Sequence, residues 1–151
     1  RYTNMQKAKL SDKLLFTKES FEVFPDLLMS DMSFKKTTVL SNANPQQKDY
    51  KWGTIELVDF TSLDGKALKG LLVKPENFDP KKKYPLLVRI HGGPQQMFGY
   101  AYRTEYAIFS GADYAVFFCN PRGSTGYGQE FCDGINGDWG GKVIEDLRSY
   151  E

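Results

Sequence analysis

The sequence has 151 residues, enough for one ordinary domain or for a small module with part of a larger one. Its hydrophobic content of 40% and aromatic content of 15% are typical of a globular protein and argue against disorder. The 20 basic and 19 acidic side chains leave a net charge of +1, so we expect no nucleic-acid partner.

The sequence shows neither a membrane-spanning segment nor a secretory signal. No apolar run approaches the roughly 18 residues that a membrane span needs, and the first residues lack the apolar core of a secretory signal. We therefore expect no membrane span, and the compartment, cytoplasmic or periplasmic, stays open. The two cysteines, Cys119 and Cys132, are too few for a disulfide framework or a zinc site, and Cys119 reads as a small buried apolar residue.

Residues 1–48 predict a β-meander. Short β-prone segments occur at 14–17, 26–29 and 36–40, about 10 to 12 residues apart and separated by turns, with a shorter apolar piece at 21–23. This spacing is typical of an antiparallel sheet. Because such a piece buries little apolar surface, it needs neighbours to be stable.

A polar stretch with a turn-favouring Asn-Pro, residues 41–49, predicts a boundary. Beyond it, residues 54–60 and 68–73 predict two strands joined by the turn Leu63-Asp64-Gly65-Lys66, where glycine permits a positive φ. Residues 75–83, with three consecutive lysines, predict a surface loop. The lysine run is expected to be a solvated face.

From Tyr84 the pattern becomes α/β. Residues 86–90 form a short apolar run, as expected for a strand covered on both faces, and 114–119 form a second. A helical stripe of aromatic residues lies between them, at Tyr102, Tyr106 and Phe109. Gly111 would end this helix. Strand, helix and strand predict a βαβ unit with a parallel strand pair.

The end of the sequence predicts another amphipathic helix. Its apolar face would hold Val143, Ile144, Leu147 and Tyr150. Asp138 is the expected N-terminal cap, and Trp139, in the turn Gly137-Asp138-Trp139-Gly140-Gly141, is expected to be buried. Because the helical pattern still continues at Glu151, we expect the chain to be part of a longer protein.

The segment His91-Gly92-Gly93-Pro94 directly follows the strand predicted at 86–90. Glycine amides at the end of a buried strand can bind the oxyanion of a tetrahedral intermediate, because no side chain blocks the approach. Gly93 is the first candidate for the amide donor and Gly92 the second, and Pro94 would fix the direction of the chain. The alternative is a tight βα turn in which the glycines serve geometry alone.

His91 is the only histidine in the sequence. A general base needs a nucleophile within reach and an acid that orients it, and the sequence offers neither. We therefore expect His91 to orient the loop. A metal site is not expected, because no further His or Cys ligands lie nearby.

A second glycine-rich segment, residues 120–128, follows the strand at 114–119 and would lie at the carboxyl end of the sheet, where open α/β folds bind ligands. It contains neither a dinucleotide-binding nor a phosphate-binding-loop motif, so a nucleotide is disfavoured. Ser124 lacks the context of a nucleophile elbow and is expected to be structural. Arg122 is expected to line the substrate pocket or to form an ion pair.

Taken together, these motifs resemble the prolyl oligopeptidase family of serine peptidases, especially its acylaminoacyl-peptidase and dipeptidyl-peptidase-like branches. The resemblance is strong over residues 52–151 and weaker over 1–48. The matching elements, in order, are Phe60-Thr61-Ser62 with Asp64-Gly65, His91-Gly92-Gly93-Pro94, Asn120-Pro121-Arg122-Gly123-Ser124-Thr125-Gly126-Tyr127-Gly128, Phe131, Gly137-Asp138-Trp139-Gly140 and Asp146.

The resemblance implies a β-propeller joined to an α/β-hydrolase domain. Residues 1–48 would then be the last propeller blade, and 52–151 the N-terminal part of the hydrolase (peptidase) domain. The family's oxyanion loop falls on His91, Gly92 and Gly93, with Pro94 and Arg122 beside the substrate. A peptide substrate and no cofactor are implied. The Ser, Asp and His of the triad are absent, so the 151 residues alone are expected to be inactive.

Two other functions remain open from the sequence. A carboxylesterase or lipase is one, since His-Gly-Gly also precedes oxyanion holes there, although Pro94 and the β-rich residues 1–48 favour the peptidase. A catalytically dead binding module is the other. An incomplete hydrolase sheet would expose an edge and apolar faces, which predicts poor solubility alone, pairing with the rest of the hydrolase domain and propeller, or a homo-oligomer.

Overall fold

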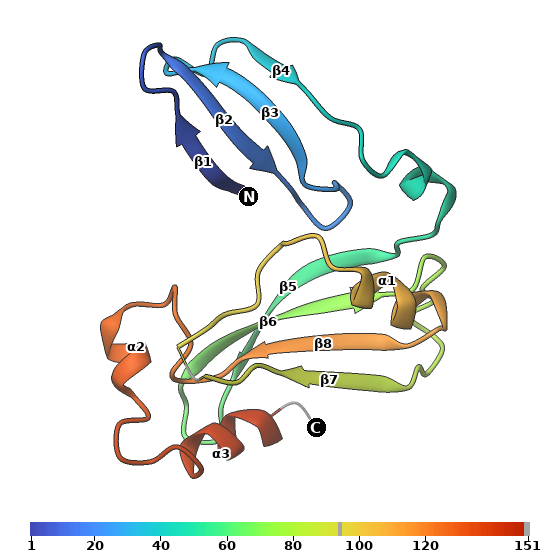
Figure 1. Cartoon of the computed structure of the whole chain (residues 1–151). Helices are drawn as coiled ribbons and strands as arrows, with labels where there is room; N and C mark the ends of the chain where they lie inside the picture. Colours follow the sequence, from blue (N-terminus) through green and yellow to red (C-terminus); the bar gives the residue numbers. More distant parts are fainter. Residues whose placement is uncertain (94, 150–151) are drawn as a thin grey trace. The chain divides into compact units, whose positions relative to one another are not determined.

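A computed structural model describes residues 1–93 and 95–149. The chain divides into two compact units (Figure 1). The first unit comprises Arg1–Lys51 together with Tyr100–Thr104, and the second comprises Trp52–Gly99 and the described residues from Glu105 onward. None of the described helices is long and apolar enough to cross a membrane.

The first unit is built on a four-stranded antiparallel sheet in the order β1-β2-β3-β4. Its strands are β1 (Tyr2–Lys7), β2 (Lys13–Lys18), β3 (Asp26–Asp31) and β4 (Thr37–Val39). The predicted meander is therefore confirmed. The sequence analysis did not predict β1, because its residues are mostly polar. Residues 21–23 form a bend rather than a strand. A 3-10 helix, η1 (Pro45–Asp49), follows the sheet.

One face of this sheet carries the core of the first unit. Leu14, Phe16 and Leu28 are buried together, since alternate residues of a strand point to the same side. The rings of Tyr2 and Phe34 flank Phe16, with centroids 5.7 and 5.6 Å from its own. Apolar side chains on the opposite face remain exposed, among them Leu15 and Leu27.

Residues Tyr100–Thr104 belong to the first unit, although they follow the second unit's strand in sequence. Tyr102 anchors them: its ring meets Phe24 edge-on at 5.1 Å, and its hydroxyl accepts a hydrogen bond of 3.0 Å from the side chain of Asn44. The amide of Tyr102 donates to a carboxylate oxygen of Glu19 at 3.2 Å. Tyr102 is thus outside the helix in which the sequence pattern placed it.

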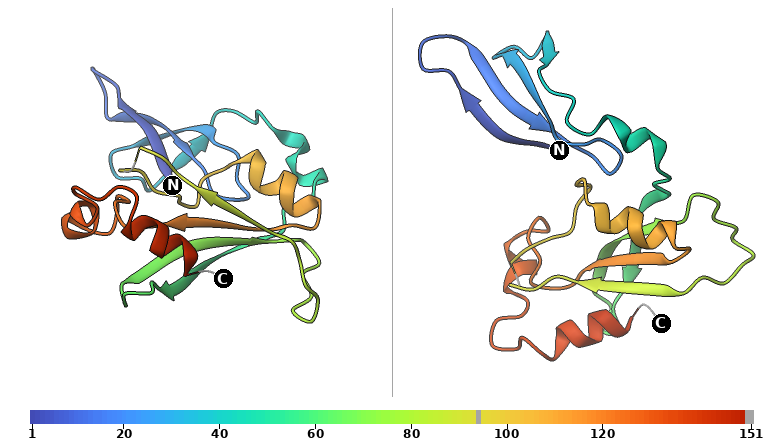
Figure 2. Two further views of the ribbon diagram at one scale, coloured as in Figure 1. Left: turned by 90° about the horizontal axis from the view of Figure 1, so that it is seen from below. Right: turned by 45° about the vertical axis from the view of Figure 1, so that its right-hand side comes forward.

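The second unit has a four-stranded mixed sheet in the order β5-β6-β8-β7 (Figure 2). Its strands are β5 (Thr54–Thr61), β6 (Ala67–Lys74), β7 (Leu86–Ile90) and β8 (Ala115–Asn120). β5 and β6 form the predicted hairpin, with Gly65 at φ +84° in the turn. β7 and β8 are parallel, with helix α1 (Thr104–Gly111) between them in sequence, which confirms the βαβ unit.

The two strands of the parallel pair differ in burial. Every residue of β8 is buried, as the apolar run predicts, because β6 and β7 flank it. β7 was expected to be covered on both faces, and this expectation is wrong for the described chain, where Leu86, Val88 and Ile90 are exposed. β7 is the last strand of the sheet, so it lacks a neighbour on one side.

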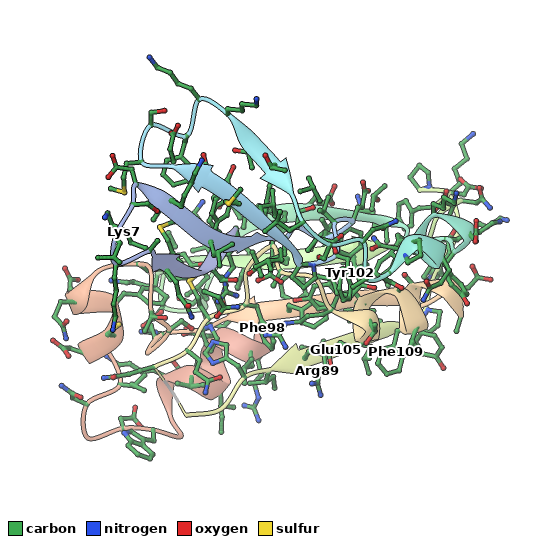
Figure 3. All side chains as sticks on the ribbon, turned by 45° about the horizontal axis from the view of Figure 1, so that its top comes forward. Lys7, Arg89, Phe98, Tyr102, Glu105 and Phe109 are labelled. Atoms are coloured by element: carbon green, nitrogen blue, oxygen red, sulfur yellow. The ribbon has the colours of Figure 1, made fainter. Side chains whose placement is uncertain are left out.

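Helix α1 packs on the sheet through a different stripe from the predicted one. Tyr106 and Ser110 are its buried residues, and the Tyr106 ring lies 4.2 Å from that of Phe118. Phe109 is 36% exposed. The helix ends at Gly111, as predicted. On its outer surface Glu105 forms an ion pair of 3.4 Å with Arg89 of β7 (Figure 3).

Two short helices close the second unit, α2 (Gln129–Asp133) and α3 (Lys142–Arg148). The N-cap residue of α3 is Gly141 rather than the predicted Asp138. Asp138 lies three residues earlier, and its carboxylate accepts hydrogen bonds from the amides of Gly141 and Lys142. The expectation of a buried tryptophan is wrong: Trp139 lies in the bend before α3 and is 74% exposed. Tyr150 and Glu151 lie outside the described residues.

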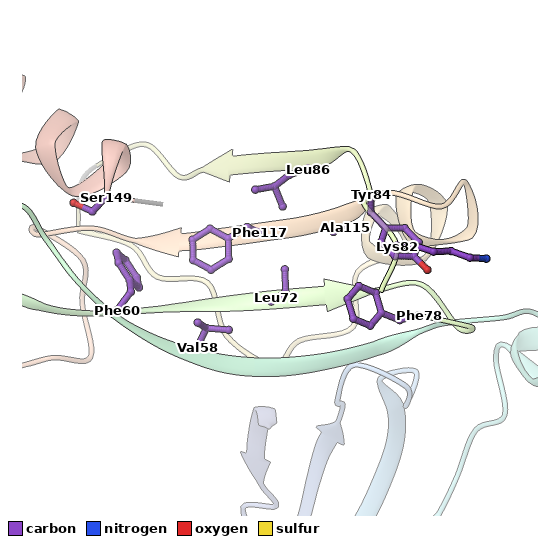
Figure 4. Close-up of a pocket in the computed structure, with 10 residues that line it drawn as sticks. All are labelled: Val58, Phe60, Leu72, Phe78, Lys82, Tyr84, Leu86, Ala115, Phe117 and Ser149. Carbon is purple, nitrogen blue, oxygen red and sulfur yellow. The ribbon is translucent and has the colours of Figure 1, made fainter. Parts of the chain in front are cut away.

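An apolar hollow of about 470 Å³ lies on the face of the sheet opposite α1 (Figure 4). Phe117 points into it, whereas its neighbour Phe118 points toward α1, as the alternation along a strand requires. Ser149, which directly follows α3, also lines the hollow. The other lining residues are Val58, Phe60, Leu72, Phe78, Lys82, Tyr84, Leu86 and Ala115.

Candidate oxyanion loop

The two glycine-bearing segments meet at one edge of the second unit's sheet. β7 and β8 run parallel with Ile90 opposite Cys119, so residues 91–93 and 121–128 leave the sheet side by side. This is the carboxyl edge, where open α/β sheets bind ligands. The register of one parallel pair thus brings together motifs that lie about 30 residues apart in sequence.

Gly92 and Gly93 are exposed, and Gly93 adopts φ +73°, a conformation that favours glycine. Among the described residues, no backbone carbonyl accepts a hydrogen bond from either amide. An added Cβ would meet nothing within 4 Å at Gly92, and at Gly93 only the flexible end of Gln96, at 3.2 Å. Both glycines are thus exposed, and no described backbone carbonyl accepts from their amides. Pro94 lies outside the described residues.

His91 contacts Ser124, with 2.9 Å between Nε2 and Oγ. The Ser124 hydroxyl also lies 2.6 Å from the carbonyl oxygen of Pro121, which can only accept. Because a hydroxyl has one proton and Pro121 takes it, Oγ must accept from Nε2–H. The neutral imidazole of His91 therefore carries its proton on Nε2.

This geometry decides what the His91–Ser124 pair can do. The sequence analysis found no base within reach of Ser124, and the structure supplies a histidine at hydrogen-bonding distance. A general base, however, must accept the nucleophile's proton, and Nε2 is a donor here. Ser124 is also completely buried, so no substrate reaches it. The pair is an orienting contact rather than a nucleophile and its base.

Aromatic packing holds the His91 ring from the other side. The Phe98 ring meets it edge-on at 5.3 Å, and Phe98 in turn meets Phe118 at 5.0 Å. Partial burial lowers the pKa of His91 below its ordinary value, and the nearby polar groups of Gly92 and Asn120 partly offset this effect. His91 is consequently neutral at pH 7.

Asn120 fixes the path of the chain after Gly92 and Gly93 through hydrogen bonds to Phe98. Its amide oxygen accepts from the Phe98 amide at 2.8 Å, and its amide nitrogen donates to the Phe98 carbonyl at 3.0 Å. The same nitrogen donates to the Tyr127 hydroxyl. The sequence analysis did not assign this role to Asn120, although a buried-strand run that ends in asparagine was a usable signal.

Arg122 is an ion-pairing residue. Its side chain is 6% exposed and lies between two carboxylates, with Nη2 2.6 Å from Asp146 and Nη1 2.6 Å from Asp64. Asp146 is fully buried. The hydrogen bonds from Arg122 hold the pKa of Asp64 well below its usual range, and the Ser62 hydroxyl adds to this effect.

The cluster around Arg122 joins three segments that are distant in sequence: the β5–β6 turn, the loop after β8, and α3. Every nitrogen of the guanidinium group donates to one of the two carboxylates. Four of the five N–H groups of the guanidinium are thereby accounted for, so the Arg122 side chain is held mainly by its two ion pairs. The sequence motifs containing Asp64, Arg122 and Asp146 gave no indication that these residues meet.

Residues 100–149 match the model of the prolyl oligopeptidase family. The chain is 41% identical over 92 residues to the "Uncharacterized peptidase YuxL" of Bacillus subtilis (strain 168), which covers 61% of this chain and 14% of that protein. It is 46% identical over 94 residues to dipeptidyl-peptidase 5 of Schizosaccharomyces pombe, with the same coverage.

A solved structure, that of an acylaminoacyl peptidase in complex with Z-Gly-Gly-Phe-chloromethyl ketone, superimposes with a TM-score of 0.82. It is 26% identical and covers 97% of this chain and 23% of its own. The chain is related to the prolyl oligopeptidase family. It spans about one seventh of the length of the curated relatives that it matches.

Proposed function

We propose that this chain supplies the oxyanion-binding loop of a serine peptidase that hydrolyses short peptides through an acyl-enzyme. The observation that carries the proposal is the pair of exposed glycines, Gly92 and Gly93, which lie at the carboxyl edge of the sheet and whose amides have no described carbonyl partner. The acylaminoacyl peptidase that superimposes on the chain binds a peptidyl chloromethyl ketone, which supports a peptide substrate.

We further propose that residues 1–48 are the last blade of a propeller and that residues 52–151 begin the hydrolase domain. The four-stranded antiparallel sheet of the first unit, with one buried and one exposed apolar face, supports the blade. The mixed sheet with its parallel pair supports the hydrolase assignment. The superposition extends over 97% of the chain and thus includes both units.

In the reaction, a nucleophile attacks the scissile carbonyl and leaves a negative charge on its oxygen. The amide of Gly93 is the first donor of a hydrogen bond to this oxyanion, and the amide of Gly92 is the second. Each such donor contributes about 2.7–4 kcal/mol to transition-state stabilisation. His91 holds the loop through Ser124 and takes no part in proton transfer, because its Nε2 already donates. No cofactor is required.

The nucleophile and the base lie outside these 151 residues, since the only histidine is committed to Ser124 and Ser124 is buried. Loss of a triad member costs about a millionfold in turnover. The isolated chain is therefore inactive. Measurable cleavage of a dipeptide anilide by the 151 residues alone, abolished by Ser124→Ala, would contradict this proposal.

The protein that contains this chain together with its triad distinguishes peptidase from esterase. We expect it to cleave dipeptide anilides with a kcat/KM that exceeds background by many orders of magnitude. A protein that hydrolyses p-nitrophenyl esters but leaves every anilide intact would be a carboxylesterase and would refute the peptidase.

The two glycines provide a matched pair of variants. Gly93→Ala places a side chain at φ +73°, which costs about 1–2 kcal/mol and shifts the donor, so kcat should fall about tenfold or more. Gly92→Ala meets open space and should retain the fold. An unchanged kcat for Gly93→Ala, in a variant shown by urea unfolding to be folded, would refute Gly93 as the donor.

A further inference from the structure

The peptide bond between Pro121 and Arg122 is held from both sides. On one side, the Arg122 amide donates to Oδ2 of Asp146 at 2.8 Å. On the other, the Pro121 carbonyl accepts from the Ser124 hydroxyl at 2.6 Å and from the Ser124 amide at 3.1 Å. Because a peptide unit is planar, fixing its N–H also fixes the direction of its carbonyl.

The carboxylate that holds this peptide is itself rigidly placed. Asp146 lies fully buried on α3 and receives three side-chain hydrogen bonds from Arg122, at 2.6 to 3.1 Å. A bidentate arginine–carboxylate pair is both strong and directional. Asp64 holds the remaining nitrogen of the guanidinium group, so the arginine cannot rotate away from Asp146.

Beyond Ser124, the same series of contacts reaches the candidate donors. Ser124 Oγ accepts from Nε2 of His91, and His91 directly precedes Gly92 and Gly93. A donating N–H polarises the carbonyl of its own peptide, which strengthens the bond that this carbonyl accepts. The charge on Asp146 thus strengthens the contact that fixes the Ser124 hydroxyl.

We propose that Asp146, Arg122 and Ser124 are positioning residues for the oxyanion loop, acting in series on His91 through the Pro121–Arg122 peptide. Asp146 and Arg122 set the peptide plane, the Pro121 carbonyl sets the Ser124 hydroxyl, and the hydroxyl sets the ring and the tautomer of His91. The catalytic consequence rests on the proposed function, whereas the effect on His91 does not.

His91 is the only histidine of the 151 residues, so in nitrogen NMR of the ¹⁵N-labelled chain the imidazole signals come from His91 alone. These signals report the contact between Nε2 of His91 and Oγ of Ser124. The unaltered chain should show a single neutral tautomer with the proton on Nε2. Ser124→Ala and Asp146→Asn should both shift the ring nitrogens toward a mixture of tautomers. The control is Asp59→Asn, which makes the same charge change at an exposed ion pair with Lys69 and should leave His91 unchanged.

A milder variant provides a test that holds even if Asp146→Asn does not fold. Asp64→Asn removes the half-exposed partner of Arg122 and leaves the buried pair with Asp146 intact, so a smaller shift in the same direction is expected. The proposal is overturned if Ser124→Ala changes the tautomer while Asp146→Asn does not. If Asp146→Asn fails to fold, an unchanged His91 in Asp64→Asn overturns it.

Turnover by the protein that contains both this chain and a triad tests the consequence for catalysis. Asp146→Asn and Ser124→Ala should lower kcat by about ten- to a hundredfold with little change in KM, because a small displacement of the donors affects the transition state more than binding. If the tautomer responds and kcat does not, the positioning of His91 stands and the oxyanion role of the loop is refuted.

Discussion

At the scale of single residues, the candidate site depends on which polar groups are already satisfied. The amides of Gly92 and Gly93 have no described carbonyl partner, whereas every guanidinium nitrogen of Arg122 and the hydroxyl of Ser124 donate to neighbours. Residue type alone suggests that arginine and serine are the reactive groups. Their burial reverses this expectation, because a group that is fully bonded and inaccessible serves to position others.

His91 should titrate below the ordinary histidine pKa of about 6.5, because burial disfavours its charged form. In the unfolded chain the ring binds a proton at higher pH than in the folded chain. Stability should therefore be unaffected by His91 above about pH 6.5 and should fall as the pH drops from there toward the folded pKa. The measurement is NMR titration of the histidine C–H resonances, alongside urea unfolding at several pH values.

His91→Asn offers the control for this titration, since asparagine retains a donor near Ser124 and does not titrate. The decrease in stability attributable to His91 should disappear in this variant. A folded-state pKa at or above 6.5 in the original chain would contradict the burial argument.

At the scale of elements, packing changed the role of the aromatic stripe around α1. The i, i+4, i+7 spacing suggested one helical face, yet Tyr102 lies before the helix and docks on the first unit, where Phe24 and Asn44 receive it. Only Tyr106 of the three is buried against the sheet. A short helix is weakly determined by its own sequence, so its first residue depends on tertiary contacts.

Tyr102 should therefore stabilise the position of residues 100–104 on the first unit. Tyr102→Phe removes the hydrogen bond from Asn44 and should cost about 1 kcal/mol. Tyr102→Ala also removes the ring contact with Phe24, which adds about 0.5–1.5 kcal/mol and the lost apolar burial. Amide hydrogen exchange of residues 100–104 should quicken in that order.

Ile108→Ala is the matched control, because Ile108 is an exposed side chain of the adjacent helix. It should leave exchange at residues 100–104 unchanged. Equal exchange rates in Tyr102→Ala and the original chain would show that Tyr102 does not anchor the segment.

At the scale of the whole molecule, the second unit has an apolar face that the described residues leave open. The hollow lined by Phe60, Leu72 and Phe117 lies opposite α1, and the edge strand β7 exposes three aliphatic side chains. Contiguous apolar surface of this kind and an unpaired strand edge both favour association.

The isolated 151 residues should therefore self-associate and bind an apolar dye such as ANS. Leu86→Ser, which removes an exposed apolar side chain that lines the hollow, should weaken dye binding, whereas Leu63→Ser, at an exposed turn position outside it, should not. Size-exclusion chromatography with light scattering checks the prediction. A stable monomer at high concentration that binds no dye would refute it.

The sequence by itself determined strands β2 to β8, the βαβ unit and the hairpin turn at Gly65, because periodicity and turn chemistry act within about ten residues. It also determined the resemblance to the family, through motifs in a fixed order. Only the tertiary structure decided that Trp139 is exposed, that β7 is a sheet edge, and that His91 meets Ser124 while Arg122 meets two carboxylates. Those outcomes depend on which distant segments approach one another, and a local pattern does not encode the identity of a partner 20 to 60 residues away.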